Sequence, residues 1–197
     1  MKITSLLPFL ALAFSTATTH GAITYSGFQN ITIGNTFGSV YVDVDQSSSS
    51  PTQASGWDID AFFGGEAFGN SAAFQPIRQT VAVSSAIVRL NLGDLVDGTD
   101  IYASAPAGSS THIGNSPGQF ASGTQGYLGF RLTDNNAAGP FYGWMRVNFS
   151  NSGGTGAILD WAYETSGSGI SVGAIPEPSA LALASIGCAT LLIRRRQ

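Results

Sequence analysis

The chain has 197 residues, of which 10% are charged and 43% hydrophobic, and this composition suits one modest domain with an apolar core. A single cysteine excludes a disulfide scaffold, and two histidines exclude a histidine-rich metal centre. Between the terminal segments, four scattered arginines stand against eleven acidic residues, and this balance excludes nucleic-acid binding because a phosphate backbone requires clustered cationic side chains.

The N-terminus has the pattern of a secretory signal peptide. After Lys2 there is no charge until Asp43, and residues 3–17 are rich in Leu, Phe and Ala. A basic start, an apolar stretch of this length and then small residues are typical of a segment that directs export and is removed. We predict a signal peptide at residues 1–22, cleaved near Ala22.

The first half of the body alternates between apolar and polar residues, as half-buried antiparallel strands do. In residues 39–45 every second residue is a valine, with Tyr or Asp between them. The same alternation in residues 57–61 directs Trp57 inward, and it directs Asp58 and Asp60 toward solvent. Residues 88–92 follow the pattern as well, so we expect three strands here.

The last third of the body predicts a three-stranded meander. Residues 127–132 and 141–149 flank residues 134–140, a segment rich in turn formers, and residues 157–164 follow a glycine-rich turn. Such a meander requires a second layer over its apolar face. The fold class expected for residues 23–174 is therefore all-β, a small antiparallel β-sandwich.

The C-terminus combines three features in order. A Pro-Glu-Pro motif comes first, then residues 179–193 without a charge, then three arginines: Pro176, Glu177, Pro178, Arg194, Arg195 and Arg196. A fifteen-residue helix spans about 22 Å, short of the roughly 30 Å apolar core of a bilayer. We predict a short transmembrane helix, with the arginines as a cytoplasmic stop and the body outside.

These features resemble the PEP-CTERM sorting signal of exopolysaccharide-producing bacteria, here over residues 175–197. The resemblance implies that the Pro-Glu-Pro motif is recognised by exosortase, a membrane-embedded protease that cuts the tail. It also implies transient anchorage, and then transfer to the cell surface or extracellular matrix in an exopolysaccharide context. Residues 126–174 are similar to the body common among PEP-CTERM proteins of uncharacterised function, a likeness that brings no activity with it.

Nucleophilic and zinc catalysis find little support. His20 leaves with the signal peptide, and His112 lies in a polar segment, where a solvated loop histidine is expected. No Gly-x-Ser-x-Gly elbow accompanies it, and zinc ligands are too few.

Paired carboxylates are the chemistry of glycoside hydrolases. The candidates are Asp43 with Asp45, Asp58 with Asp60, Glu66, and Asp160 with Glu164. Alternation places the first two pairs on outward faces, so the favoured interpretation is solvating charge on strands. Catalysis would require their enclosure in a cleft.

Calcium suits acidic residues better, because it prefers oxygen ligands. Asp94, Asp97 and Asp100 lie close together in one segment and are the candidate ligands, although no EF-hand or RTX spacing is present. An ordinary acidic turn is the alternative, and no other cofactor is expected.

Sugar binding requires exposed aromatic faces. Candidate stacking residues are Tyr142, Trp144, Trp161 and Tyr163. Burial in the sandwich core is the favoured alternative for them, although Arg146 on the Trp144 face argues for exposure of that face.

The expected function is that of an exported, non-enzymatic protein of the cell surface or extracellular matrix, processed through its tail. A carbohydrate-binding module for exopolysaccharide is the first alternative, and a secreted glycoside hydrolase is the second. The expected partners are exosortase, the membrane through the C-terminal helix, and exopolysaccharide.

Overall fold

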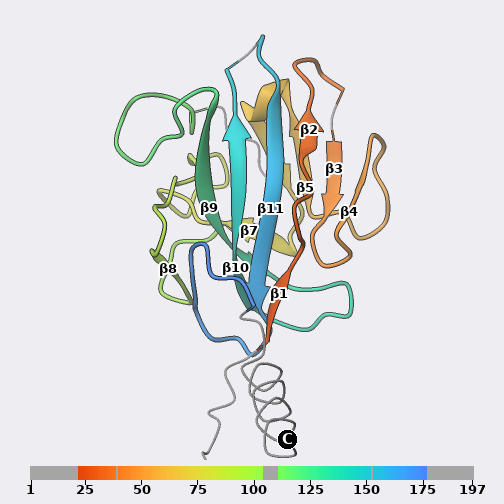
Figure 1. Ribbon diagram of the computed structural model, residues 1–197, viewed down its shortest axis with the longest axis vertical. Coiled ribbons are helices and arrows are strands. Elements are labelled where there is room, and N and C mark those ends of the chain that lie inside the picture. The colour runs from red at the N-terminus through yellow and green to blue at the C-terminus, as the bar shows by residue number, and fades with distance from the viewer. Residues whose placement is uncertain (1–21, 39, 104–110, 152, 177–197) are drawn as a thin grey trace, which may run out of the picture.

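The computed structural model describes residues 22–38, 40–103, 111–151 and 153–176. Within these ranges the chain forms β-strands and one short 3₁₀ turn, η1 (Phe63–Gly65), and every pair of strands is antiparallel (Figure 1). The all-β prediction is therefore confirmed for this part of the chain. The predicted signal peptide and the C-terminal helix lie outside the described residues, apart from Ala22 and the first two residues of the tail.

A six-stranded sheet forms the centre of the molecule. Its strands run in the order β1-β11-β10-β9-β7, and β2 also pairs with β11. Their bounds are β1 Ile23–Tyr25, β2 Ile31–Ile33, β7 Phe74–Pro76, β9 Thr124–Leu132, β10 Phe141–Phe149 and β11 Gly156–Glu164. The predicted hairpin and the strand that follows it are thus confirmed as β9, β10 and β11.

A four-stranded sheet lies against the first, with shorter strands in the order β4-β3-β5-β6. Their bounds are β3 Val40–Asp43, β4 Ser48–Ser50, β5 Ile59–Phe62 and β6 Ala67–Asn70. A two-stranded sheet pairs β8 (Leu95–Val96) with β12 (Ile170–Ser171). The predicted strands at 39–45 and 57–61 correspond to β3 and β5.

The two larger sheets share one hydrophobic core, as in a sandwich. The four-stranded sheet contributes Val42, Ile59 and Phe68, and the six-stranded sheet contributes Phe130 and Trp161, with further apolar side chains from both. All five are fully buried. The inward face of the alternating pattern therefore supplies this core, as the sequence predicts for the valines of β3.

A second apolar cluster covers the opposite face of the six-stranded sheet. Tyr142, Trp144 and Ala162 of the central strands contact Val96 and Ile170 of the two-stranded sheet. The central strands β10 and β11 are consequently buried on both faces, and the argument for exposure of the Trp144 face is wrong.

Residues 88–92, all of which the structure describes, form no regular strand, so that prediction is wrong. Leu90 makes one isolated bridge to Tyr127 of β9, while Val88 and Leu90 pack half-buried against the second cluster. The third apolar residue of the pattern, Leu92, is 70% exposed, and the segment is held as a loop by main-chain hydrogen bonds to Ile77, Gly118 and Tyr127.

The first and last described residues lie at the same end of the molecule (Figure 1). The Ala22 carbonyl accepts a hydrogen bond from the Thr165 amide at 3.1 Å, just beyond the end of β11. The Ala174 carbonyl accepts one from the Trp144 indole at 2.9 Å. Within the described ranges, no helix has the length and apolar character needed to cross a membrane.

Candidate functional site: the outer face of the four-stranded sheet

Strand alternation gathers acidic side chains on the outer face of the four-stranded sheet. Val42 and Val44 point into the core, so Tyr41, Asp43 and Asp45 point away from it. The neighbouring strand β5 pairs with β3 in antiparallel register, which places Asp60 opposite Tyr41 and brings Asp58, just before β5, to the end of the sheet. Two acidic stretches far apart in the sequence are thereby brought side by side.

Asp43, Asp45 and Asp58 converge there, with a carboxylate oxygen from each lying within 4.8 Å of the other two. Asp58 is only 2% exposed, so the prediction that it faces solvent is wrong. Its carboxylate accepts a hydrogen bond from the Val44 amide at 2.8 Å and a longer one from the Ser71 hydroxyl at 3.5 Å. Asp58 therefore closes the end of the sheet beneath the other two acids.

The loop between β9 and β10 supports the cluster from the other sheet. The main-chain nitrogen of Asn135 donates to Asp45 Oδ2 at 3.1 Å, and the side-chain nitrogen of the same residue donates to Asp43 Oδ2 at 3.0 Å. Gly56 lies beneath this side chain at a φ of +82°, and a Cβ there would come within 2.7 Å of the Asn135 amide group. Glycine at this position lets the loop close onto the acids.

The three carboxyl groups of the cluster lie close together and are partly buried, so their negative charges repel one another and are poorly solvated. Burial raises the pKa of Asp58 to about 7, and the charges of Asp43 and Asp45 add to the effect. Burial also raises the pKa of Asp43, and its contact with Asp45 raises it further. Among the described residues the ion pair is Arg146 with Asp160, in the other sheet, so no arginine neutralises the cluster.

Two species could relieve this repulsion: a proton shared among the carboxyl groups, or a divalent cation. Carboxylate and amide oxygens are ligands that calcium accepts, and calcium takes six to eight of them. The three carboxylates and the Asn135 amide could supply part of such a shell. The sequence predicts calcium at Asp94, Asp97 and Asp100 and not at this cluster. Calcium binding by this protein stays a prediction.

Asp94, Asp97 and Asp100, the predicted calcium ligands, do not converge. The Asp94 carboxylate accepts a hydrogen bond from the Asn91 amide at 2.7 Å, and Asp97 accepts two from Thr99. Asp100 accepts one from the Asp97 amide at 3.0 Å. Each carboxylate closes its own turn, which is the acidic-turn alternative of the sequence analysis.

Next to the acidic cluster, two aromatic side chains line a surface pocket. Tyr41 and Trp57 meet edge to face, with ring centroids 5.6 Å apart and planes at 82°. The pocket is small, about 50 Å³, and its lining residues are Tyr41, Asp43, Ser48, Ser49, Ser50, Ala54, Ser55 and Trp57. Trp57 is half-buried and lies against the outward Tyr41, so the prediction that it points into the core is wrong.

The four candidate residues for sugar stacking are buried, as the favoured alternative of the sequence analysis predicts. Tyr142 is 9% exposed, Trp144 3%, Trp161 0% and Tyr163 7%. The indole nitrogens of both tryptophans donate to main-chain carbonyls, Trp144 to Ala174 at 2.9 Å and Trp161 to Val44 at 3.0 Å. This burial counts against sugar binding at these residues.

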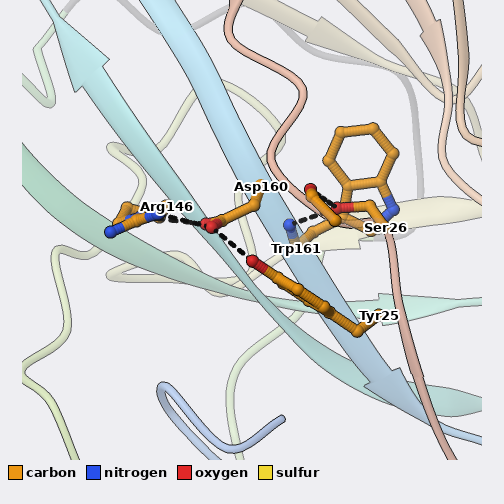
Figure 2. A network of polar contacts seen from close by, with 6 residues as sticks. Tyr25, Ser26, Arg146, Asp160 and Trp161 are labelled. Carbon is orange, nitrogen blue, oxygen red and sulfur yellow. Dashed lines mark hydrogen bonds and ion pairs between the residues drawn. The ribbon is translucent and has the colours of Figure 1, made fainter. Parts of the chain in front are cut away.

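Asp160 and Glu164, considered as a hydrolytic pair, both hold structural contacts. Figure 2 shows Asp160 joined to Arg146 and Tyr25 on one face of the six-stranded sheet. Arg146 donates to both carboxylate oxygens, at 2.9 and 2.5 Å, and the Tyr25 hydroxyl donates at 2.9 Å. The Glu164 carboxylate accepts hydrogen bonds from the amides of Ser166 and Ser168, each at 2.9 Å, and so closes the turn after β11.

His112 is fully buried, so the prediction of a solvated loop histidine is wrong. Its Nε2 lies 2.7 Å from the Gly65 carbonyl oxygen, and its ring packs edge-on against Phe120 and Phe149. The polar residues around it in the sequence gave no sign of this. An apolar Ile113 and Phe120 nearby were the only local hint that the segment folds inward.

The predicted sorting residues lie at the edge of the described chain. Pro176 is its last described residue and is exposed. Glu177, Pro178 and Arg194 to Arg196 lie outside the described residues. Comparisons with protein-family models, with curated protein sequences and with solved structures give no match.

Proposed function

We propose that this chain is an exported, non-enzymatic protein of the cell surface or extracellular matrix, sorted and cut at its C-terminal tail by exosortase. The observation that carries the proposal is the order of signals along the sequence. A signal-peptide pattern begins the chain, and the Pro-Glu-Pro motif, an apolar segment and an arginine cluster end it. Exopolysaccharide is the proposed surrounding of the mature protein.

The arrangement of the chain ends supports this proposal. Ala22 and Ala174 are both hydrogen-bonded at the same end of the sandwich (Figure 1). A body held at the membrane by its tail would then project from the bilayer in one direction. Cleavage at either end would leave the strand pairings of the body intact, because β1 begins at Ile23 and β12 ends at Ser171.

The non-enzymatic part of the proposal is supported by what the carboxylates do. Asp160 is paired with Arg146, and Glu164 accepts two main-chain amides. Asp94 and Asp97 close turns. A hydrolase would require two carboxyl groups flanking a substrate cleft, and among the residues that line the Tyr41–Trp57 pocket Asp43 is the one carboxylate.

The test is the intact mass of the mature protein, measured from the native host and from a strain that lacks exosortase. We expect the residues after the Pro-Glu-Pro motif to be missing only where exosortase is present. Glu177→Ala should block the cut, and Pro117→Ala, in an exposed loop of the body, should leave it unchanged. A mature mass that retains Arg194 to Arg196 in both strains would contradict the proposal.

A further inference from the structure

The three tryptophans of the chain differ in one respect that points to a ligand. The indole nitrogens of Trp144 and Trp161 donate to carbonyl groups inside the protein. Trp57 is half-buried at the surface, and among the described residues its indole nitrogen has no protein acceptor. The Tyr41 hydroxyl beside it is likewise without a protein partner in the described ranges. Amphipathic rings with free polar tips are typical of surfaces that bind a partner.

The register of the strands surrounds these rings with hydroxyl and carboxylate groups. Tyr41 of β3 lies opposite Ser50 of β4, and Asp43 lies opposite Ser48. Residues paired in this way share a face, and all four line the pocket with Trp57. One strand thus supplies the serines, the next supplies an aromatic ring and a carboxylate, and the turn before β5 supplies the indole.

The Asp43 carboxylate keeps hydrogen-bonding capacity for a ligand. It accepts the Gln46 amide at 2.9 Å through one oxygen and the Asn135 side chain at 3.0 Å through the other. A carboxylate has about four lone-pair sites, and the contact with Asp45 occupies a third, so about one remains. This capacity suits one hydroxyl group of a ligand.

The charge of the surroundings selects against anions. Asp45 and Asp58 lie beside Asp43, and in the described part of the chain none of the three forms an ion pair. A ligand with a carboxylate, sulfate or phosphate would meet these charges at close range. The ligand class that remains has an apolar C–H face for the rings and neutral hydroxyl groups for the serines and Asp43.

We propose that the Tyr41–Trp57 pocket binds a neutral sugar unit of a polysaccharide, with the ring of the sugar against Trp57 and its hydroxyl groups on Asp43 and the serines of β4. The pocket is small, about 50 Å³, so the site would hold part of a single sugar ring and leave the rest of the ring exposed. The site goes beyond the sorting function and does not depend on it, because binding is independent of how the chain reaches the surface. It also lies on the opposite side of the core from Trp144.

The test is isothermal titration calorimetry with the full-length chain in a detergent that has no sugar headgroup. The probes are four neutral tetrasaccharides, of glucose in α and β linkage, of mannose and of galactose, together with tetragalacturonate as the acidic counterpart of the last. We expect at least one neutral tetrasaccharide to bind and tetragalacturonate to bind at least about tenfold more weakly. Binding of none of the neutral probes, or equal binding of the acidic one, would overturn the proposal.

Variants separate stacking from folding. Trp57→Ala should weaken the affinity about tenfold or more, and Trp57→Phe should restore part of it, because a phenyl ring still offers a stacking face. Asp43→Asn keeps the shape and should weaken binding by several-fold. The matched control is Phe37→Ala, which removes an aromatic side chain that is 76% exposed and absent from the pocket lining. Equal affinity of Trp57→Ala and Phe37→Ala, with both variants folded by thermal unfolding, would contradict the assignment.

Discussion

The two large sheets of this protein differ in what surrounds their buried aspartates. In the six-stranded sheet, Asp160 is 2% exposed and is neutralised by Arg146 and hydrogen-bonded by Tyr25 (Figure 2). In the four-stranded sheet, Asp58 is equally buried but lies beside two other carboxyl groups. In the first arrangement an arginine pairs with the carboxylate, whereas in the second, burial and the neighbouring carboxyl groups raise the pKa of Asp58 to about 7.

Strand length accounts for part of this difference. The central strands β9, β10 and β11 have nine residues each, and covering on both faces buries the Asp160 carboxylate, while its partner Arg146 stays 28% exposed. The strands of the smaller sheet have three or four residues and one outer face. Charges that gather at their ends remain accessible to a proton or a ligand. The longer sheet therefore holds the body together, and the shorter sheet offers the candidate site.

The largest expected effect comes from the side chain that joins the two sheets. Trp161 lies in β11, is fully buried and donates its indole hydrogen to the carbonyl of Val44, beyond the end of β3. Trp161→Ala should lower the free energy of unfolding by about 3–5 kcal/mol, because it leaves a cavity and an unpaired carbonyl. Chemical denaturation measures this. Trp57→Ala is the matched control and should cost about 1 kcal/mol or less. Equal losses in the two variants would show that the sheets are not joined at Trp161.

A smaller effect is expected at the ion pair of the larger sheet. Arg146→Met keeps an unbranched apolar stem but removes the guanidinium, and it leaves the Asp160 carboxylate buried with only Tyr25 to donate to it. We expect a loss of about 2–3 kcal/mol, reduced from that of a fully buried pair because Arg146 is 28% exposed. The double variant with Asp160→Asn should recover part of the loss in equilibrium unfolding. Additive losses would mean that the two residues do not act as a pair.

The third effect belongs to Asp58 and, unlike the first two, depends on pH. Its pKa is about 7 in the folded protein against 3.8 in an unfolded chain, so the folded state holds the proton more tightly. Stability should therefore fall as pH rises from about 4 to about 7, and the loss is complete above that range. Asp58→Asn should flatten this slope and should be about 2 kcal/mol more stable than the parent at pH 8.

The groups around Asp58 determine the conditions under which its pH dependence is measured. Asp43 and Asp45 face it, together with the Val44 amide and the Ser71 hydroxyl. Unfolding curves are recorded in EDTA, so that protonation alone is tested, and repeated with calcium chloride to test the calcium prediction. A parent protein whose stability rises between pH 4 and 7 in EDTA would contradict the assignment.

Much of the fold could be predicted from local pattern. Nine-residue strands with turn formers between them specify a meander, because few other structures satisfy both features, and β9, β10 and β11 form as expected. The alternation around Val42 correctly gave the inward face of β3. Residues 88–92 misled because a loop with two half-buried side chains, Val88 and Leu90, has locally the same period as a strand, although Leu92 is exposed.

The candidate site could be predicted only in part. Alternation placed Asp43 and Asp45 on the outer face, but the pairing of β3 with β5, which brings Asp58 beside them, is a long-range register. The Asn135 contact crosses 90 residues of sequence. Trp57 departs from its alternation because Gly56 turns the chain just before β5. Each of these depends on tertiary structure that no local spacing encodes.

The hydrogen bond from Trp144 to the Ala174 carbonyl has a mechanical consequence for a chain held by its C-terminus. A pulling force on that end reaches Ala174 first, and through the indole it is passed directly to β10, in the middle of the largest sheet. The next contacts along the chain are the paired residues of β12 and the hydrogen bond between Val172 and Asp94. Force on the C-terminus is therefore carried by central strand β10 before it can separate β11 from the sheet. The body would resist such force better than its short outer strands suggest.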